Sequence, residues 1–291
     1  MIDLKKLGTQ AGRVVRAAHT AATAPVATEA EPDARPTFQA QASGLALIDD
    51  LVLANRILYA RGVLDSFGHV SVRHPEERGH FFMARSMGPG QVTAADILEF
   101  DADANALDQR ERAIYSERYI HSEIYRVRPD VAAVVHSHSP GVIPFGVTPV
   151  PLQPISVTAP FLFTGVPIYD PRDAGESEML VRNPALGRTL AMLLADHAVA
   201  LMRGHGNVVV GPTLRVAVTR AVYTEVNARL QTQAVILAAG GPINFLSTQE
   251  AARLEEMAAR EVAGTGRGAD RAWEMWRAEL EAGHGDHDHE H

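Results

Sequence analysis

The sequence predicts an α/β sandwich built on a mostly antiparallel sheet. Short apolar strand patterns and longer helical patterns are mixed along the chain, without the regular strand–helix–strand repeat that is typical of a parallel sheet. The 291 residues are 46% hydrophobic and 21% charged, which is enough apolar surface for a sizeable core. We therefore expect one large α/β domain over residues 44–265, preceded by an arm (1–43) and followed by a helix with a tail (266–291).

The composition argues against several classes of function. Lys and Arg number 27 against 35 Asp and Glu, and no basic stripe appears, so nucleic acid is not an expected partner. The chain has no cysteine, which excludes disulfides, cysteine-bound zinc and a thiolate nucleophile. No apolar run approaches the roughly 20 residues of a membrane span, and the first residues lack a secretory apolar segment. We therefore expect a cytoplasmic protein without a membrane partner.

The first hundred residues are predicted to contain an arm, a helix and three strands. Residues 18–43 are dominated by Ala, Thr, Pro, Glu and Gln, a composition typical of a flexible arm. Apolar residues at helical spacing predict a helix over 44–62 that ends at a glycine. Residues 68–74 alternate as a strand, 80–84 form its hairpin partner, and 93–100 begin with a capping threonine and lead into a third strand.

The rest of the chain alternates helices with strands. The predicted order is helix 109–127 stopped by Pro129, strand 131–138, irregular stretch 140–160, helix 184–196, strands 198–202 and 207–210, and helix 213–239. Ser247 and Glu250 form a capping box that opens one more helix. Trp273 and Trp276 lie on one face of a last helix, and this apolar stripe indicates a contact within the chain or between subunits rather than a ligand site.

His136 and His138 are the most informative residues of the chain. They end a valine-rich run that is typical of a buried strand, and residues two apart on a strand project from the same face. His205 lies between two glycines in the connection of two further strands. Three neutral imidazoles leave an open coordination position, as expected of a catalytic metal site. The alternative is that all three are ordinary hydrogen-bonded histidines at strand ends.

Glu117 and His121 are four residues apart on the predicted helix 109–127 and would share a face with Ile114. A carboxylate in an apolar stripe is costly unless it serves a partner. Near a divalent ion, Glu117 would act as a fourth ligand or as a proton-transfer group. His121 would contact the ligands without binding the ion itself. The alternative is a surface glutamate in a charged run with Arg112 and Arg118.

Four motifs together resemble the class II aldolase and adducin family over roughly residues 44–265. They are Gly68-His69-Val70-Ser71-Val72-Arg73, Ser116-Glu117, Val134-Val135-His136-Ser137-His138 and His205-Gly206. The resemblance implies a three-layer αβα sandwich, a homotetramer, and a divalent metal ion held by three histidines, which correspond to His136, His138 and His205. It also implies that Glu117 is the acid–base residue.

The departures from the family pattern concern the phosphate contacts. His69 stands where the sugar-phosphate aldolases have asparagine, Arg85-Ser86 replaces a Thr-Gly pair, and Tyr115-Ser116 replaces Ser-Ser. We therefore expect these five residues to bind a small carboxylate, for which an arginine fork and an imidazole are suited. The alternative for His69 and Arg85 is a structural pairing with acidic residues.

The resemblance is closest to the decarboxylases of this family. The leading hypothesis is a metal-dependent lyase, a decarboxylase of a hydroxyaromatic or pyridine carboxylic acid, in aromatic compound catabolism. The metal could be Mn, Zn, Co or Fe. Alternatives are an aldolase acting on an unphosphorylated hydroxy-keto acid, a non-haem iron oxygenase of a hydroxyphenylpyruvate-like acid, and a structural module like the adducin head. The histidine-rich tail over 283–291 receives no catalytic role.

Overall fold

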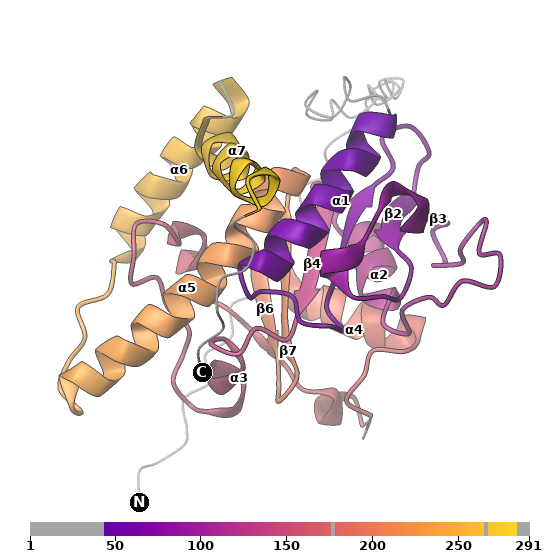
Figure 1. Ribbon diagram of the computed structural model, residues 1–291. Helices are drawn as coiled ribbons and strands as arrows, with labels where there is room; N and C mark the ends of the chain where they lie inside the picture. The colour runs from indigo at the N-terminus through magenta and orange to yellow at the C-terminus, as the bar shows by residue number, and fades with distance from the viewer. Residues whose placement is uncertain (1–43, 176–177, 265–266, 284–291) are drawn as a thin grey trace, which may run out of the picture. The chain divides into compact units, whose positions relative to one another are not determined.

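A central sheet of seven strands organises the part of the chain that the structure describes (Figure 1). This computed structural model describes residues 44–175, 178–264 and 267–283, so the predicted arm and the histidine-rich tail lie outside the described residues. The strand order is β3-β2-β1-β4-β7-β6-β5. Every neighbouring pair is antiparallel except β5 and β6, which confirms the mostly antiparallel prediction.

The strands are short, and most correspond to predicted ones. Their bounds are β1 His69–Arg73, β2 Phe81–Ala84, β3 Ile97–Phe100, β4 Ala133–Ser137, β5 Ile168–Tyr169, β6 Val199–Met202 and β7 Gly206–Gly211. Of these, β5 was not predicted, because two residues are too few for an alternating pattern. Thr93 begins the single turn Ala94–Asp96 that leads into β3, as predicted.

Helices cover both faces of the sheet, which confirms the sandwich (Figure 1). The helices α1 (Gly44–Ala60), α5 (Leu214–Ala238) and α7 (Arg267–Glu281) cover one face, and α2 (Tyr119–Val127) and α4 (Pro184–Leu194) cover the other. Side chains of β4 alternate between the two layers: Ala133 and Val135 belong to the first core, and Val134 belongs to the second. His136 is therefore on the α2 side of the sheet.

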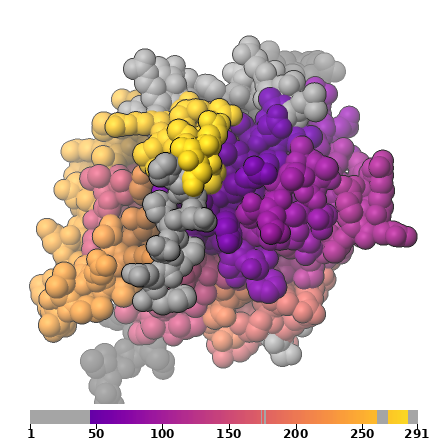
Figure 2. Space-filling view, viewed as in Figure 1, coloured from indigo at the N-terminus to yellow at the C-terminus, as the bar shows by residue number. Residues whose placement is uncertain are grey.

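The C-terminal helix belongs to the core on the α1 side. Trp273 is fully buried and Trp276 is 3% exposed. The guanidinium of Arg215 lies 5.2 Å from the ring of Trp273, and that of Arg61 lies 5.5 Å from the ring of Trp276. In Figure 2, α7 (yellow) lies against α1 (indigo). The tryptophan stripe is thus a contact within the chain.

The predicted helix over 109–127 begins only at Tyr119. Arg110 and Glu111 have φ angles of 44° and 63°, and this left-handed backbone is incompatible with a right-handed helix. Glu117 lies in the turn just before α2, where its carbonyl accepts a hydrogen bond from the backbone N–H of Ile120. The prediction that Glu117 and His121 share one helical face was therefore wrong.

The connections contain further short elements. The proline-rich stretch 140–160 is irregular apart from α3 (Ile143–Val147), and α6 (Thr248–Gly264) follows the capping box at Ser247. Single turns of 3₁₀ helix cover Pro89–Gln91, Pro160–Thr164 and Pro171–Ala174. Among the described helices, none has the length and apolar character that a membrane crossing requires.

Candidate metal centre

His136, His138, His205 and Glu117 meet at one end of the sheet. One potential ligand atom from each lies within 4.8 Å of the others. His136 is the fourth residue of β4, and His138 follows the end of the strand on the same face. His205 lies in the turn between β6 and β7, and Glu117 approaches from the turn before α2. The structure thus brings together the residues that the sequence pattern singled out.

Glycine is required beside His205. A Cβ atom added to Gly206 would lie 2.0 Å from the carbonyl oxygen of Ser137, a distance no real side chain tolerates. Gly204 has a φ of 62°, in the left-handed region that glycine adopts without strain. These two glycines allow the turn to approach β4 closely enough for His205 to reach His138.

The hydrogen bonds of His136 and His138 direct their Nε2 atoms toward a common point. Nδ1 of His136 donates to the carbonyl oxygen of Asn207 at 3.2 Å, which leaves its Nε2 as a lone-pair donor. Nδ1 of His138 faces both carboxylate oxygens of Asp65 at 3.1 Å. Nε2 of His138 then lies 3.1 Å from Nε2 of His205.

These separations fit a shared cation. Oε2 of Glu117 lies 3.4 Å from Nε2 of His205 and 3.7 Å from Nε2 of His136. Two ligand atoms about 2.1 Å from a tetrahedral ion are about 3.4 Å apart. In the described part of the chain, Nε2 of His136 and Nδ1 of His205 are buried without a hydrogen-bond partner, which is costly unless something else satisfies them.

The electrostatic environment favours neutral His136 and ionised Glu117, which are the forms that bind metal ions. Burial lowers the pKa of His136 to about 3, although Glu117 opposes the shift, so its imidazole is neutral at neutral pH. Burial raises the pKa of Glu117, but its interactions with His205 and His136 and the hydrogen bond from Val181 outweigh this and lower it to about 2. Oε1 of Glu117 also accepts a 2.8 Å hydrogen bond from the backbone N–H of Val181, which fixes the carboxylate.

Asp65 is a functional candidate that the sequence analysis missed. Its Oδ1 accepts hydrogen bonds from the backbone N–H groups of Phe67 and Gly68, each 2.9 Å long, while both oxygens face His138. Burial raises the pKa of Asp65, but the hydrogen bonds from Phe67, His138 and Gly68 lower it overall. A carboxylate behind a histidine orients the ring and makes it a better metal ligand. In sequence, Asp65 is an ordinary turn residue, so nothing singled it out.

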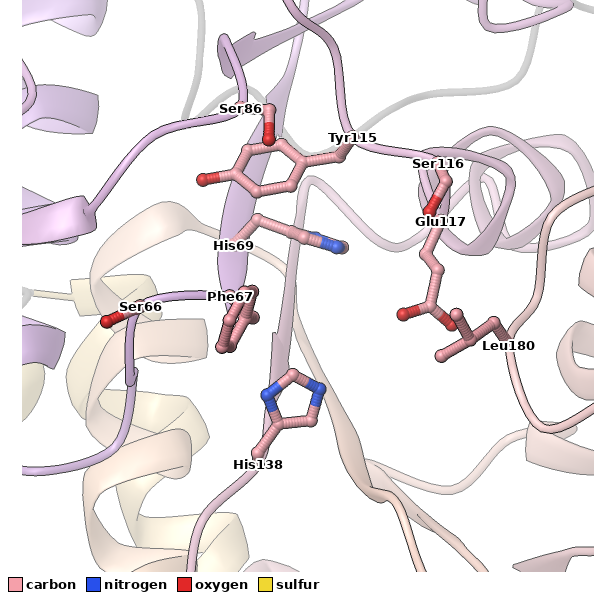
Figure 3. A pocket seen from close by; sticks show the side chains of 9 residues that line it. All are labelled: Ser66, Phe67, His69, Ser86, Tyr115, Ser116, Glu117, His138 and Leu180. Atoms are coloured by element: carbon pink, nitrogen blue, oxygen red, sulfur yellow. The ribbon is translucent and has the colours of Figure 1, made fainter.

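A pocket of about 240 Å³ opens beside the four converging residues (Figure 3). Its lining consists of Ser66, Phe67, His69, Ser86, Tyr115, Ser116, Glu117, His138 and Leu180. Four of the five expected substrate-binding residues are among them, namely His69, Ser86, Tyr115 and Ser116. Ser66, Phe67 and Leu180 were not foreseen, because they come from loops without a recognisable motif.

Arg85, the fifth expected residue, does not line this pocket. Its Nε donates a 2.7 Å hydrogen bond to Oδ1 of Asp96, and the two form an ion pair. In the β2–β3 ladder Ala84 is opposite Ile97, so the next residue outward, Arg85, faces Asp96. This ion pair corresponds to the structural alternative stated for Arg85.

Comparisons with known proteins identify the family to which this fold belongs. The model of the "Class II Aldolase and Adducin N-terminal domain" family matches residues 49–232. The decarboxylase tropJ of Talaromyces stipitatus is 37% identical over 249 residues, which cover 78% of this chain and 91% of that protein. The 3,4-dihydroxyphthalate decarboxylase of Arthrobacter keyseri is 32% identical over 222 residues, or 71% of this chain and 85% of that protein.

A solved structure extends the agreement to the fold. The aldolase II superfamily protein from Pseudomonas syringae superposes with a TM-score of 0.69 at 24% identity, covering 86% of this chain and 98% of that one. The family model alone matches more than half of the chain. This protein therefore belongs to the class II aldolase and adducin family.

Proposed function

We propose that this protein is a metal-dependent decarboxylase of a small hydroxyaromatic carboxylic acid. The observation that carries the proposal is the convergence of three imidazoles and one carboxylate beside a pocket. The names of two relatives, decarboxylase tropJ and 3,4-dihydroxyphthalate decarboxylase, support the reaction type and the substrate class. The fold alone does not decide this, because one fold hosts many reactions.

His136, His138 and His205 would hold the divalent ion, with Glu117 beside it. Imidazole ligands suit Mn, Zn, Co and Fe alike. The ion would supply Lewis-acid stabilisation of the negative charge that develops when a carbon atom loses CO₂. The chain itself orients His136 through Asn207 and His138 through Asp65.

The dimensions and lining of the pocket suit a small aromatic acid. Its volume of about 240 Å³ is below the roughly 300 Å³ at which pockets for drug-sized ligands begin. Phe67, Tyr115 and Leu180 provide apolar surface for a ring, and the serines of the lining provide hydroxyl groups for its polar substituents. Tyr115 is held in place because its hydroxyl donates a 2.6 Å hydrogen bond to the carbonyl of Met87.

Glu117 is the proposed proton-transfer group. In the reaction, the bond between the ring carbon and the carboxylate breaks, CO₂ leaves, and the electron pair stays on the ring carbon, which must then receive a proton. Glu117 lines the pocket next to the ligand histidines. Its carboxylate can take the proton of a substrate hydroxyl and return it to the ring carbon.

Release of CO₂ from a panel of acids tests the proposed reaction. The protein is stripped of metal, reloaded with Mn²⁺, Co²⁺, Zn²⁺ or Fe²⁺, and incubated with hydroxybenzoates and dihydroxyphthalates. We expect metal-dependent CO₂ release from at least one of these acids. Phthalate, which has no hydroxyl to chelate the ion, serves as the control and should not react. Cleavage of a hydroxy-keto acid into two carbonyl products, without CO₂ release from the panel, would favour an aldolase instead.

We also propose that the protein is a homotetramer, as the family resemblance implies. An apolar surface near the C-terminal end of α5 supports assembly, because Ile236 is 71% exposed and Leu237 is 85% exposed. Light scattering should give about four times the 31.4 kDa mass of one chain. An active species with the mass of a single chain would contradict this proposal.

A further inference from the structure

A chain of hydrogen bonds runs from the pocket into the core on the α2 side of the sheet. Nδ1 of His69 lies 2.6 Å from Nε2 of His121, and Nδ1 of His121 lies 2.6 Å from Oγ of Ser71. Oγ of Ser71 lies 2.7 Å from the hydroxyl of Tyr125. All four side chains are buried, and only His69 lines the pocket. The proposed reaction makes no use of the other three.

Tyr125, at the end of these hydrogen bonds farthest from the pocket, determines which group donates in each of them. The Tyr125 hydroxyl has one hydrogen, and in the described part of the chain the only acceptor it reaches is Oγ of Ser71. The backbone N–H of Val134, which also approaches the hydroxyl oxygen of Tyr125, can only donate. If Ser71 donated to Tyr125, the hydroxyl hydrogen of Tyr125 would be buried without an acceptor, which is costly. Tyr125 therefore donates to Ser71.

The remaining hydrogens follow in order. Ser71 Oγ accepts from Tyr125, so among its described partners the acceptor left for its own buried hydrogen is Nδ1 of His121. The hydrogen of His121 is then on Nε2, which donates to Nδ1 of His69. His69 consequently carries its hydrogen on Nε2. Among the described residues, the hydrogen bond found for the His69 ring is the one at Nδ1, and Nε2 faces the pocket that His69 lines.

The Nε2–H group of His69 is available to a ligand next to the candidate metal centre. His69 is paired with His136 across β1 and β4, and the centres of their rings are 5.0 Å apart. The His69 ring also packs against Tyr115, with ring centres 4.5 Å apart. In Figure 3 the His69 ring extends from β1 below Tyr115, toward the side of the pocket where Glu117 lies.

We propose that His69 is a specificity-determining residue whose Nε2–H donates a hydrogen bond to a second carboxylate of the substrate. His121, Ser71 and Tyr125 are positioning residues that keep Nδ1 of His69 occupied and its hydrogen on Nε2. This inference rests on the proposed function and adds to it the residue that recognises the second carboxylate of a phthalate-type acid. One polar group of the substrate would bind the metal ion, and the second carboxylate would accept the hydrogen bond from Nε2–H of His69.

Binding of phthalate and benzoate tests this inference without turnover. The two acids differ by one carboxylate, and neither carries the hydroxyl of the proposed substrate. For the metal-loaded protein we expect phthalate to bind about tenfold to a hundredfold more tightly, as for a hydrogen bond to a charged group. His69→Leu should remove this preference, whereas His69→Gln, which retains an N–H donor, should keep most of it. Equal affinities in the unmodified protein would overturn the proposal.

Ser71→Ala tests the positioning chain, with Ser71→Thr as the variant that retains a hydroxyl. We expect Ser71→Ala to reduce the phthalate preference about threefold to tenfold at unchanged metal content, and Ser71→Thr to restore it. Long-range ¹⁵N–¹H spectra of the histidine-labelled protein should show the hydrogen of His69 on Nε2. A hydrogen on Nδ1, or an unchanged preference in folded, metal-loaded His69→Leu, would overturn the proposal. Neither readout requires catalysis, so a failure of the proposed decarboxylation would be recognised separately in the CO₂ assay.

Discussion

His136→Gln is expected to abolish metal binding and CO₂ release together. The substitution removes a buried imidazole whose Nε2 has no other partner in the described part of the chain. Stabilisation of developing charge by a bound ion is worth several kcal/mol, so its loss should lower kcat/KM by on the order of 10³-fold. The measurement is metal per chain by mass spectrometry, together with the rate of CO₂ release.

His197→Gln is the matched control for this variant. His197 precedes β6, at the opposite end of that strand from His205, and its Nδ1 lies 3.4 Å from the hydroxyl of Thr164. Its replacement should leave both metal content and rate unchanged. Full activity of metal-free His136→Gln would refute the proposed role of the three histidines.

Glu117→Gln is expected to retain the metal and lose turnover. Glutamine has nearly the same shape and can still accept the hydrogen bond from the backbone N–H of Val181. A neutral amide cannot take up and return a proton, so kcat should fall by about 10²- to 10⁴-fold. The measurements are kcat, metal content, and incorporation of solvent deuterium into the product.

Glu77→Gln, at an exposed position in the turn between β1 and β2, is the control and should behave as the unmodified protein. Near-normal turnover of Glu117→Gln, together with complete loss of activity on metal removal, would mean that water delivers the proton. Loss of the metal from Glu117→Gln would instead assign Glu117 as a ligand.

The parts of the fold that follow local patterns could be predicted from the sequence. Alternation identified β1, β2, β4, β6 and β7, and helical spacing identified α1, α4 and α5. The start of α2 could not be predicted, because Arg110 and Glu111 adopt left-handed conformations that their residue types do not favour.

The candidate site likewise contains residues that the sequence identifies and residues that only the fold brings to the site. His136 and His138 are placed together by the two-residue period of one strand, and His205 was identified because glycines flank it. Asp65 reaches His138 only through the fold, from a loop that has no motif of its own. The partner of Arg85, Asp96, could not be named from the sequence, because the pairing depends on the register between β2 and β3. Long-range pairing of this kind leaves no mark in a single sequence.

The position of the metal ion tests the central claim most directly. A crystal structure of the protein loaded with Zn²⁺ or Mn²⁺, with anomalous scattering measured at the absorption edge of the metal, would locate the ion. We expect one strong peak about 2.1 Å from Nε2 of each of His136, His138 and His205. An active, metal-loaded protein with no peak at this point, or with its ion bound elsewhere, would contradict the account.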